Sequence, residues 1–164
     1  MNATTGAVSF GTAPNYEAPS DADGNNVYDV TVTATDGGGL TATQAVALTV
    51  TDVNEAPVVT APLADQTTAE DTAFSFVVPA NTFADVDLGD QLTLSASLSN
   101  GDPLPAWLGF DAATGTFSGT PGNSDVGSVN VTVTATDSGN LSVSDIFALT
   151  VTNVNDAPTV ANAI

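Results

Sequence analysis

Carboxylates are the residues through which this chain could do chemistry. The chain has 16 Asp and 3 Glu but no Lys, Arg, His or Cys, and its formal net charge is −19. Most of the aspartates lie within two residues of Gly, Asn or Pro, in segments that are typical of loops. One interpretation is that they form turns and keep the surface soluble. The other is that these loops bind hard cations, because Ca²⁺ takes about six to eight oxygen ligands.

Two short segments have the densest carboxylates. Asp21-Ala22-Asp23-Gly24-Asn25 has the alternating spacing of a calcium loop, and a tight turn that caps a hairpin explains the same residues equally well. The segment that contains Asp85, Asp87 and Asp90 is richer in carboxylates, and a bound Ca²⁺ is favoured there over a plain turn.

The composition excludes most catalytic chemistry. A Ser-His-Asp triad, a Cys nucleophile, a Schiff-base lysine and a His/Cys zinc site all need residue types that the chain lacks. Pairs of aspartates could serve a glycosidase as acid and base, but no cleft aromatics or basic residues accompany them. We therefore expect that the protein is not an enzyme.

The charge also limits the partners. No basic residue is available to neutralise phosphates, so we expect no nucleic-acid partner, and anionic membrane surfaces would repel the chain. No stretch approaches the roughly 20 apolar residues of a membrane span, so we expect no direct insertion into a membrane.

An internal repeat defines the elements that position these carboxylates. Val30–Pro57 returns as Val131–Pro158 at a constant offset of 101 residues, with no gap across 28 residues. Val, Thr and Ala alternate with period two between Gly, Asp, Asn and Pro, which predicts strands and turns. We therefore expect an all-β chain of tandem Greek-key β-sandwich modules.

The same patterns predict the individual strands and the core. Strands are expected near Gly6–Phe10, Asn26–Thr35, Thr41–Thr51, Val58–Ala61, Thr72–Pro79, Gln91–Leu98, Gly115–Ser118, Gly127–Thr136 and Ser142–Thr152. Core candidates are Phe74, Phe76, Leu92, Leu94, Trp107, Leu108, Phe110, Phe117, Val131, Val133, Ile146, Leu149 and Val151.

The modules are unequal. Residues 1–55 lack a counterpart of Val58–Phe110 and are expected to be the C-terminal half of a repeat. Residues 56–155 are expected to be a complete repeat, and 156–164 the start of a following one whose first strand is Thr159–Ile164. Half a sandwich exposes an apolar face and unpaired strand edges. Either the sequence begins within a domain, or another chain supplies the other strands by swapping or strand addition.

Several motifs resemble those of cadherin repeats. Tyr28–Asp36, followed by Asp52–Pro57, is similar to the A-x-D loop and the D-x-N-D-N-x-P linker at the end of such a repeat. Asn15-Tyr16-Glu17 is similar to the acidic D-R-E motif of that family. Pro103–Pro121 resembles the dystroglycan-type, cadherin-like subgroup and bacterial immunoglobulin-like modules. The resemblance implies cadherin- or Ig-like sandwiches, the first of them incomplete.

The resemblance also implies Ca²⁺ at the joints between repeats. The ligands it implies at the joint before the second unit are Asn15, Glu17, Asp52, Asn54, Glu55, Glu70, Asp85, Asp87 and Asp137. Asn153, Asn155 and Asp156 would serve the following joint, and Asp36 a preceding one. The following linker begins with Asn153 where the family has Asp, so we expect this joint to bind Ca²⁺ more weakly.

The function that follows is mechanical. We expect a non-catalytic, calcium-rigidified adhesion module of a large bacterial repeat protein, secreted or associated with the cell surface, whose partners are its neighbouring repeats. Absence of Cys in a chain that resembles extracellular proteins favours a bacterial source. The alternatives are a carbohydrate-binding accessory module of a polysaccharide-degrading enzyme, a homophilic contact module and a passive spacer. The carbohydrate module needs an exposed aromatic platform such as Trp107, whose apolar neighbours favour a core position instead.

Overall fold

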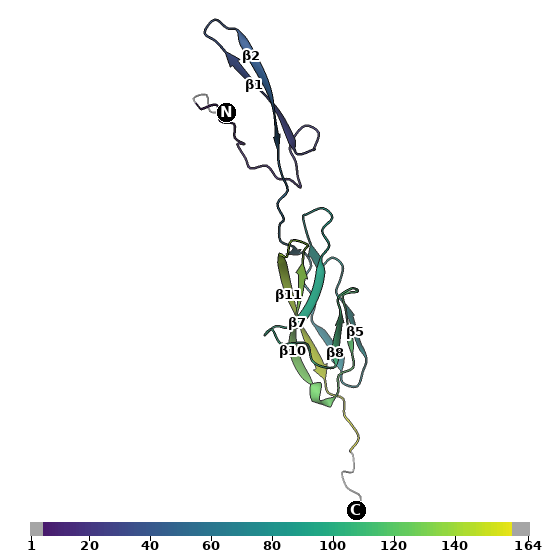
Figure 1. The fold of residues 1–164 in the computed structure, drawn as a ribbon. Coiled ribbons are helices and arrows are strands. Elements are labelled where there is room, and N and C mark those ends of the chain that lie inside the picture. Colours follow the sequence, from purple (N-terminus) through teal and green to yellow (C-terminus); the bar gives the residue numbers. More distant parts are fainter. Residues whose placement is uncertain (1–4, 159–164) are drawn as a thin grey trace, which may run out of the picture. The chain divides into compact units, whose positions relative to one another are not determined.

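The computed structural model describes residues 5–158 and divides into two compact units, with the boundary between Asn54 and Glu55 (Figure 1). The strand expected at Thr159–Ile164 lies outside the described residues. In the described part of the chain, every regular element is a strand except one 3-10 helix, η1 (Asn123–Asp125).

The first unit is built on one hairpin. β1 (Val27–Thr35) pairs antiparallel with β2 (Thr41–Thr49) in continuous register, from Val27 opposite Thr49 to Thr35 opposite Thr41. The two strands form a two-stranded sheet, as their alternating sequences predict. The prediction of a strand at Gly6–Phe10 is wrong, because this segment pairs with no strand of residues 5–158. Phe10 instead packs edge-on against Tyr28, with ring centroids 5.0 Å apart.

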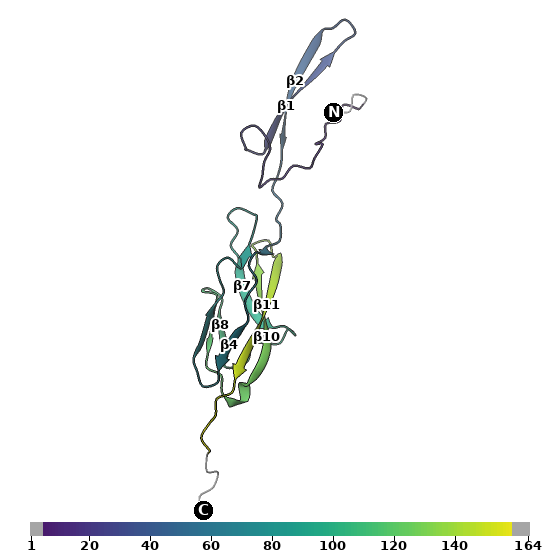
Figure 2. The same ribbon diagram turned by 180° about the vertical axis from the view of Figure 1, so that it is seen from behind.

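The second unit is a β-sandwich of two main sheets (Figures 1 and 2). One sheet has the order β4-β11-β10-β7 and the other β5-β9-β8, while β3 and β6 form a small pair. The strands are β3 (Val58–Val59), β4 (Gln66–Ala69), β5 (Phe74–Val77), β6 (Phe83–Ala84), β7 (Thr93–Leu98), β8 (Leu108–Asp111), β9 (Thr116–Gly119), β10 (Gly127–Thr136) and β11 (Ser142–Thr152). β4 runs parallel to β11, and all other pairs are antiparallel.

The core lies between the two sheets. It is formed by the inward-facing residues of β10 and β11 together with aromatic side chains of the smaller sheet, in which Phe117 is completely buried. Phe147 contacts both Phe76 and Phe117 edge-on, at centroid distances of 5.3 and 5.6 Å. The packing of these rings joins the two sheets.

One core prediction was wrong. Ile146 is 53% exposed, and its neighbour Phe147 is buried in its place. Successive residues of a strand face opposite sides, so a strand that buries Leu149 and Val151 must also bury Phe147 and turn Ile146 outward. The sequence pattern does not predict the short strands β4, β6 and β8. Segments of two to four residues carry little alternation, although it sufficed to locate β3, β5 and β9.

Candidate metal site

Three aspartates of the second unit converge in the loop between β6 and β7. Asp85, Asp87 and Asp90 each offer a carboxylate oxygen, and these oxygens lie within 4.8 Å of one another. All three residues are half-buried. We call these residues the aspartate cluster. The loop doubles back because Asp85 Oδ1 accepts a hydrogen bond from the backbone N–H of Asp87 at 3.0 Å, and because Gly89 adopts φ = +94°.

In each carboxylate of the aspartate cluster, only one of the two oxygens accepts a hydrogen bond from the protein. Asp85 Oδ1 is held by the N–H of Asp87, and Asp90 Oδ1 accepts a hydrogen bond from the hydroxyl of Ser138. Asp87 Oδ2 accepts a hydrogen bond from the backbone N–H of Glu55 at 2.9 Å. The second oxygen of each side chain, Asp85 Oδ2, Asp87 Oδ1 and Asp90 Oδ2, is buried and has no hydrogen-bond donor. The protein therefore fixes the orientation of three carboxylates and leaves three acceptor oxygens unused.

Electrostatics makes this arrangement costly without a cation. A buried acceptor that lacks a donor costs about 1–3 kcal/mol. Two like charges about 4.8 Å apart repel by on the order of 3 kcal/mol at an effective dielectric constant near 20. The chain has no Lys, Arg or His to offset either term. Three carboxylates that each place an oxygen within 4.8 Å of the others suit a hard cation such as Ca²⁺.

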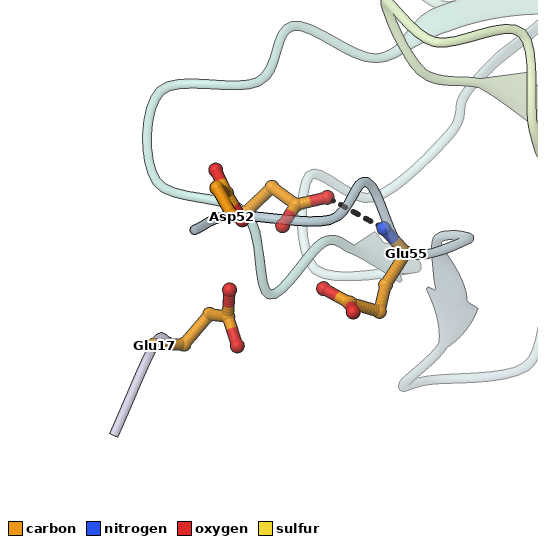
Figure 3. Close-up of side chains that lie close together, drawn as sticks. Glu17, Asp52 and Glu55 are labelled. Atoms are coloured by element: carbon orange, nitrogen blue, oxygen red, sulfur yellow. Dashed lines mark hydrogen bonds between the residues drawn. The ribbon is translucent and has the colours of Figure 1, made fainter. Parts of the chain in front are cut away.

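The first residue of the second unit belongs to this site. Figure 3 shows Glu55 with the hydrogen bond that its backbone N–H donates. Because the acceptor is Asp87 of the aspartate cluster, the chain is attached to the β6–β7 loop where it enters the unit. The motif Asp-Val-Asn-Glu-Ala-Pro suggested Glu55 as a ligand through its side chain, and the contact through its backbone was not foreseen.

The turn between β10 and β11 lies at the same end of the unit, since it contains Ser138, which bonds Asp90. Asp137 is 6% exposed, and its Oδ1 accepts a hydrogen bond from the N–H of Leu141 at 2.8 Å. In the first unit, Asp36 holds the equivalent turn by accepting from the N–H groups of Gly38 and Leu40. One carboxylate oxygen of Asp36 and one of Asp137 therefore serve to hold a turn.

Glu70 lies at the opposite end of the second unit from the place expected for it. Its side chain is 1% exposed, and Oε1 accepts hydrogen bonds from Asn153 Nδ2 and from the N–H of Val154, which follow β11. The Ser138 turn precedes β11, and this strand of 11 residues spans roughly 35 Å. Glu70 therefore does not join the aspartate cluster. The reason is the parallel pairing of β4 with β11, which directs the end of β4 toward residues 153–154.

The residues after β11 form polar contacts at the same end of the unit as Glu70. Asn123 of η1 donates a hydrogen bond from Nδ2 to Asp156 Oδ2 at 2.6 Å, and Asn155 Nδ2 contacts the carbonyl oxygen of Asp156 at 3.5 Å. Glu70 Oε2 is buried without a donor. Sequence reasoning did not single out Asn123, which no motif marks. The expectation that Asn153, Asn155 and Asp156 bind Ca²⁺ stays a prediction.

The candidate ligands of the first unit lie before and after the hairpin. Asn15 Oδ1 accepts a hydrogen bond from the N–H of Glu17 at 2.9 Å. In the Asp21–Asn25 segment, Asp21 Oδ2 accepts a hydrogen bond from the N–H of Val27 at 3.2 Å, and Asp23 Oδ2 accepts one from Asn25 Nδ2 at 2.8 Å. This segment leads into β1 and joins no pair of strands, so the hairpin-turn interpretation is wrong. Asp52 and Asn54 are exposed in the irregular segment after β2, and the roles of all these residues as ligands stay predictions.

Trp107 is a core residue. It is half-buried, packs against the core cluster and meets Phe74 edge-on at 6.3 Å. Gly119 is required beside it, because a Cβ atom there would lie 1.8 Å from the carbonyl oxygen of Trp107. The apolar neighbours in Leu-Pro-Ala-Trp-Leu-Gly-Phe therefore indicated the position of Trp107 correctly.

Known proteins agree with this fold. The family model He_PIG, described as "Putative Ig domain", matches residues 56–152. Protocadherin gamma B7 extracellular cadherin domains 1–4 are similar in structure, with a TM-score of 0.57 and 24% identity over 80% of this chain. Protocadherin gamma B2 extracellular cadherin domains 1–5 give 0.56 and 24% over 80%, and the protocadherin gammaB7 EC3-6 cis-dimer structure gives 0.56 and 25% over 77%.

These likenesses establish an Ig-like or cadherin-like β-sandwich. The chain spans only 27 to 33% of the length of those protocadherin structures. No curated protein sequence matches it. Domains of this class are typically extracellular and non-catalytic. Among the residues that the structure describes, no helix has the length and apolar character to cross a membrane.

Proposed function

This chain belongs to the Ig-like family whose model matches residues 56–152, and from that premise we propose that it is a calcium-binding, calcium-rigidified adhesion module of a large bacterial surface or secreted repeat protein. The module catalyses no reaction. Its partners are the neighbouring repeats of the same chain, which its linkers join to it.

The observation that carries this proposal is the set of three unused oxygens in the aspartate cluster. Asp85, Asp87 and Asp90 each have one oxygen held by the protein and one buried without a donor. A surface turn that merely kept the protein soluble would expose its carboxylates to water. Half-buried carboxylates that are oriented through one oxygen and have no donor for the other are suited to bind a cation.

Binding of Ca²⁺ would join three segments of the second unit. The aspartate cluster already contacts the backbone of Glu55 and the hydroxyl of Ser138. An ion would offset the repulsion among the three carboxylates and strengthen both contacts. The entry of the chain, the β6–β7 loop and the β10–β11 turn would then move as one body. In its absence the carboxylates repel one another, and the entry residue Glu55 is held less firmly.

The adhesive role follows from stiffness. An array of modules that extends a binding region from a cell needs rigid joints, and Ca²⁺ at each joint would supply them. Three carboxylates provide fewer oxygens than the six to eight or so that Ca²⁺ takes. Under this proposal, the side chains of Glu55 and Asp137 add oxygens to those of the aspartate cluster. Asn15, Glu17, Asp52 and Asn54 are also proposed as Ca²⁺ ligands. Asp36 serves a preceding joint in the same way, and Asn153, Asn155 and Asp156 serve a following one.

Calorimetric titration with Ca²⁺ tests the site. We expect the wild-type chain to bind Ca²⁺ with a dissociation constant of roughly 10⁻⁴–10⁻³ M, which is typical of extracellular modules. Asp85→Asn and Asp90→Asn should each weaken binding about tenfold or more, because each removes a ligand charge. Asp29→Asn is the matched control, since it removes the same charge from an exposed position on β1. Equal affinities for all three variants, or no binding by the wild type, would refute the proposal.

Thermal unfolding with and without Ca²⁺ tests rigidification. At a free Ca²⁺ concentration one hundred times the dissociation constant, one site adds about 2.7 kcal/mol to the free energy of unfolding. The wild type and Asp29→Asn should show this increase, and the aspartate-cluster variants should lose most of it. A melting temperature and hydrodynamic size that do not change after chelated protein receives millimolar Ca²⁺ would contradict a structural role.

A further inference from the structure

The chain enters and leaves the second unit at opposite ends of the sandwich. It enters at Glu55, which bonds Asp87 of the aspartate cluster, and it leaves at Val154, which bonds Glu70 at the other end. We call these the entry end and the exit end. β11 runs from one to the other and spans roughly 35 Å. Tension on the two flanking segments therefore pulls the unit along the direction of β11.

Two strands that lie along this direction connect the two flanking segments. β4 runs parallel to β11, from Gln66 opposite Leu149 to Ala69 opposite Thr152 (Figure 2). β4 is an edge strand, and within residues 5–158 it pairs with β11 alone. Tension draws β4 toward the entry end and β11 toward the exit end. The hydrogen bonds of a parallel pair are evenly spaced along the strands, so this sliding strains them together instead of one after another.

Two carboxylates fasten the beginning of this pairing. Asp145 Oδ2 on β11 accepts a hydrogen bond from the backbone N–H of Leu63 at 2.6 Å. In return, Asp65 Oδ1 accepts one from the backbone N–H of Ala148 at 2.7 Å. Both bonds lie just before the first pair of the β4–β11 ladder. A hydrogen bond to a carboxylate is roughly twice as strong as one between neutral groups.

A third carboxylate fastens the end of the pairing. The backbone N–H of Glu70 donates to the carbonyl oxygen of Thr152 at 3.0 Å, directly after the last ladder pair. Its side chain, which is 1% exposed, accepts hydrogen bonds from Asn153 Nδ2 and from the N–H of Val154. The β4–β11 ladder is therefore bounded at both ends by carboxylate contacts between its two segments.

We propose that Asp65, Asp145 and Glu70 form a clamp that keeps β4 on β11 when the module is under tension. The tension itself comes from the repeat array of the proposed function, and in this respect the inference rests on that function. The clamp needs no Ca²⁺, because its partners are backbone and amide donors. Separation of β4 would also remove Leu63 from the hydrophobic core, so unfolding of the sandwich follows release of the clamp.

Single-molecule force measurements on the full chain test the clamp, with a chelator present throughout. The chain has no Cys, so introduced thiols are unique attachment points. Ala56→Cys with Ala157→Cys pulls β4 and β11 in opposite directions along their length. Ala73→Cys with Ala157→Cys pulls the two strands apart from the exit end and opens their bonds in succession. All three alanines are exposed.

The first attachment pair should require the larger unfolding force at the same loading rate, and equal forces would overturn the proposal. Both attachment points of the first pair follow Glu55 in the chain, so tension does not pass through the contact of Glu55 with the aspartate cluster. Failure of the Ca²⁺ titration would therefore leave this result unaffected, and failure of the clamp would leave the titration unaffected.

Alanine variants test the carboxylates themselves. With the first attachment pair, Asp145→Ala should unfold about tenfold faster or more at constant force, because it removes a charge-assisted hydrogen bond that resists sliding. Asp65→Ala should change the rate in the same direction, and it is the variant to use if Asp145→Ala does not fold. Asp111→Ala is the matched control. It removes a carboxylate that accepts two hydrogen bonds in the β8–β9 turn, which stays folded while β4 separates.

The control should unfold at the wild-type rate under tension, although it loses equilibrium stability. With the second attachment pair, Asp145→Ala should accelerate unfolding less than with the first. Equal acceleration by the clamp variants and Asp111→Ala, or equal acceleration with both attachment pairs, would show that these carboxylates only stabilise the fold and would overturn the proposal.

Discussion

The backbone N–H of Glu55 donates a hydrogen bond to Asp87 Oδ2 at 2.9 Å and so attaches the first residue of the second unit to the aspartate cluster. This contact gives a cation site a mechanical consequence. An ion bound to the other oxygen of Asp87 would restrict the residue at which the chain enters the sandwich. The hydrogen bond to Glu55 uses Oδ2 of this carboxylate and leaves Oδ1 without a donor.

Removal of the Ser138 hydroxyl should weaken Ca²⁺ binding. Ser138 holds Asp90 Oδ1, so Ser138→Ala leaves that carboxylate free to rotate. Loss of a residue that orients a ligand typically reduces metal affinity about 10-fold or more. Calorimetric titration measures the change. Ser124→Ala, in η1 at the other end of the unit, should bind like the wild type, and an equal loss in both variants would contradict the orienting role.

Changes at Glu70 should affect stability without affecting the aspartate cluster. Glu70→Ala removes the acceptor of Asn153 Nδ2 and the Val154 N–H, and should cost about 1–3 kcal/mol in denaturant unfolding. Glu70→Gln keeps a carbonyl acceptor and should cost less. The Ca²⁺ affinity of the aspartate cluster should stay the same in both. A loss as large as that of Asp85→Asn would show that Glu70 acts at the other end after all.

The inward direction of Phe147 can be tested against its neighbour. Phe147→Ala should reduce the free energy of unfolding by about 3–5 kcal/mol, because it opens a cavity between the sheets. Ile146→Ala should cost less than about 1 kcal/mol, since this side chain is mostly exposed. Urea unfolding of the two variants measures both values, and similar losses would contradict the register of β11.

Gly119 should tolerate no side chain. The Cβ of Gly119→Ala would overlap the backbone carbonyl of Trp107, and relief of that overlap should cost about 1–3 kcal/mol or more. Gly109→Ala is the control, because its nearest neighbour would be Ser118 O at an ordinary 3.6 Å. Trp107 fluorescence during unfolding reports on both variants. A neutral Gly119→Ala would mean that β9 and the segment before β8 do not approach so closely.

Asp111 should contribute stability that disappears in acid. Hydrogen bonds from the Thr114 hydroxyl and the N–H of Ala113 hold the pKa of Asp111 below its ordinary value of 3.8. A carboxyl whose folded-state pKa is lowered stabilises the fold above its unfolded-state pKa and loses that effect as pH falls through the folded-state pKa. The difference in melting temperature between wild type and Asp111→Asn should be constant near neutral pH and shrink below about pH 4. A difference that does not vary with pH would contradict this role of the carboxylate.

Much of the fold could be predicted because it depends on local pattern. The alternation in Val27–Thr35 and Gly127–Thr136 identified long strands, and the Asp36 and Asp137 turns recur at equivalent positions of the repeat. The prediction of a strand at Gly6–Phe10 is wrong because a short alternating segment becomes a strand only beside a partner strand. The prediction that Ile146 lies in the core is wrong because hydrophobicity alone does not reveal which side of a strand a residue faces.

The candidate site likewise has features that the sequence predicts and features that it does not. Asp85, Asp87 and Asp90 are close in sequence, so their convergence could be predicted from spacing alone. Their contacts with Glu55 and Ser138 could not, because those partners are 32 and 48 residues away in the chain. The motif places Glu70 at the wrong end of the unit, because the direction of β4 depends on its pairing with the distant β11.

By itself, the sequence determined which chemical groups this chain offers, and it predicted how the chain is divided into repeats. A chain without Lys, Arg, His or Cys has few catalytic groups, and a repeat of 101 residues with period-two alternation predicts tandem sandwiches. The tertiary structure alone decided which carboxylate oxygens are held and which are left unused, and to which end each acidic residue belongs. Those properties depend on contacts between segments far apart in the chain, and a sequence pattern specifies residue types without specifying which distant atoms will meet.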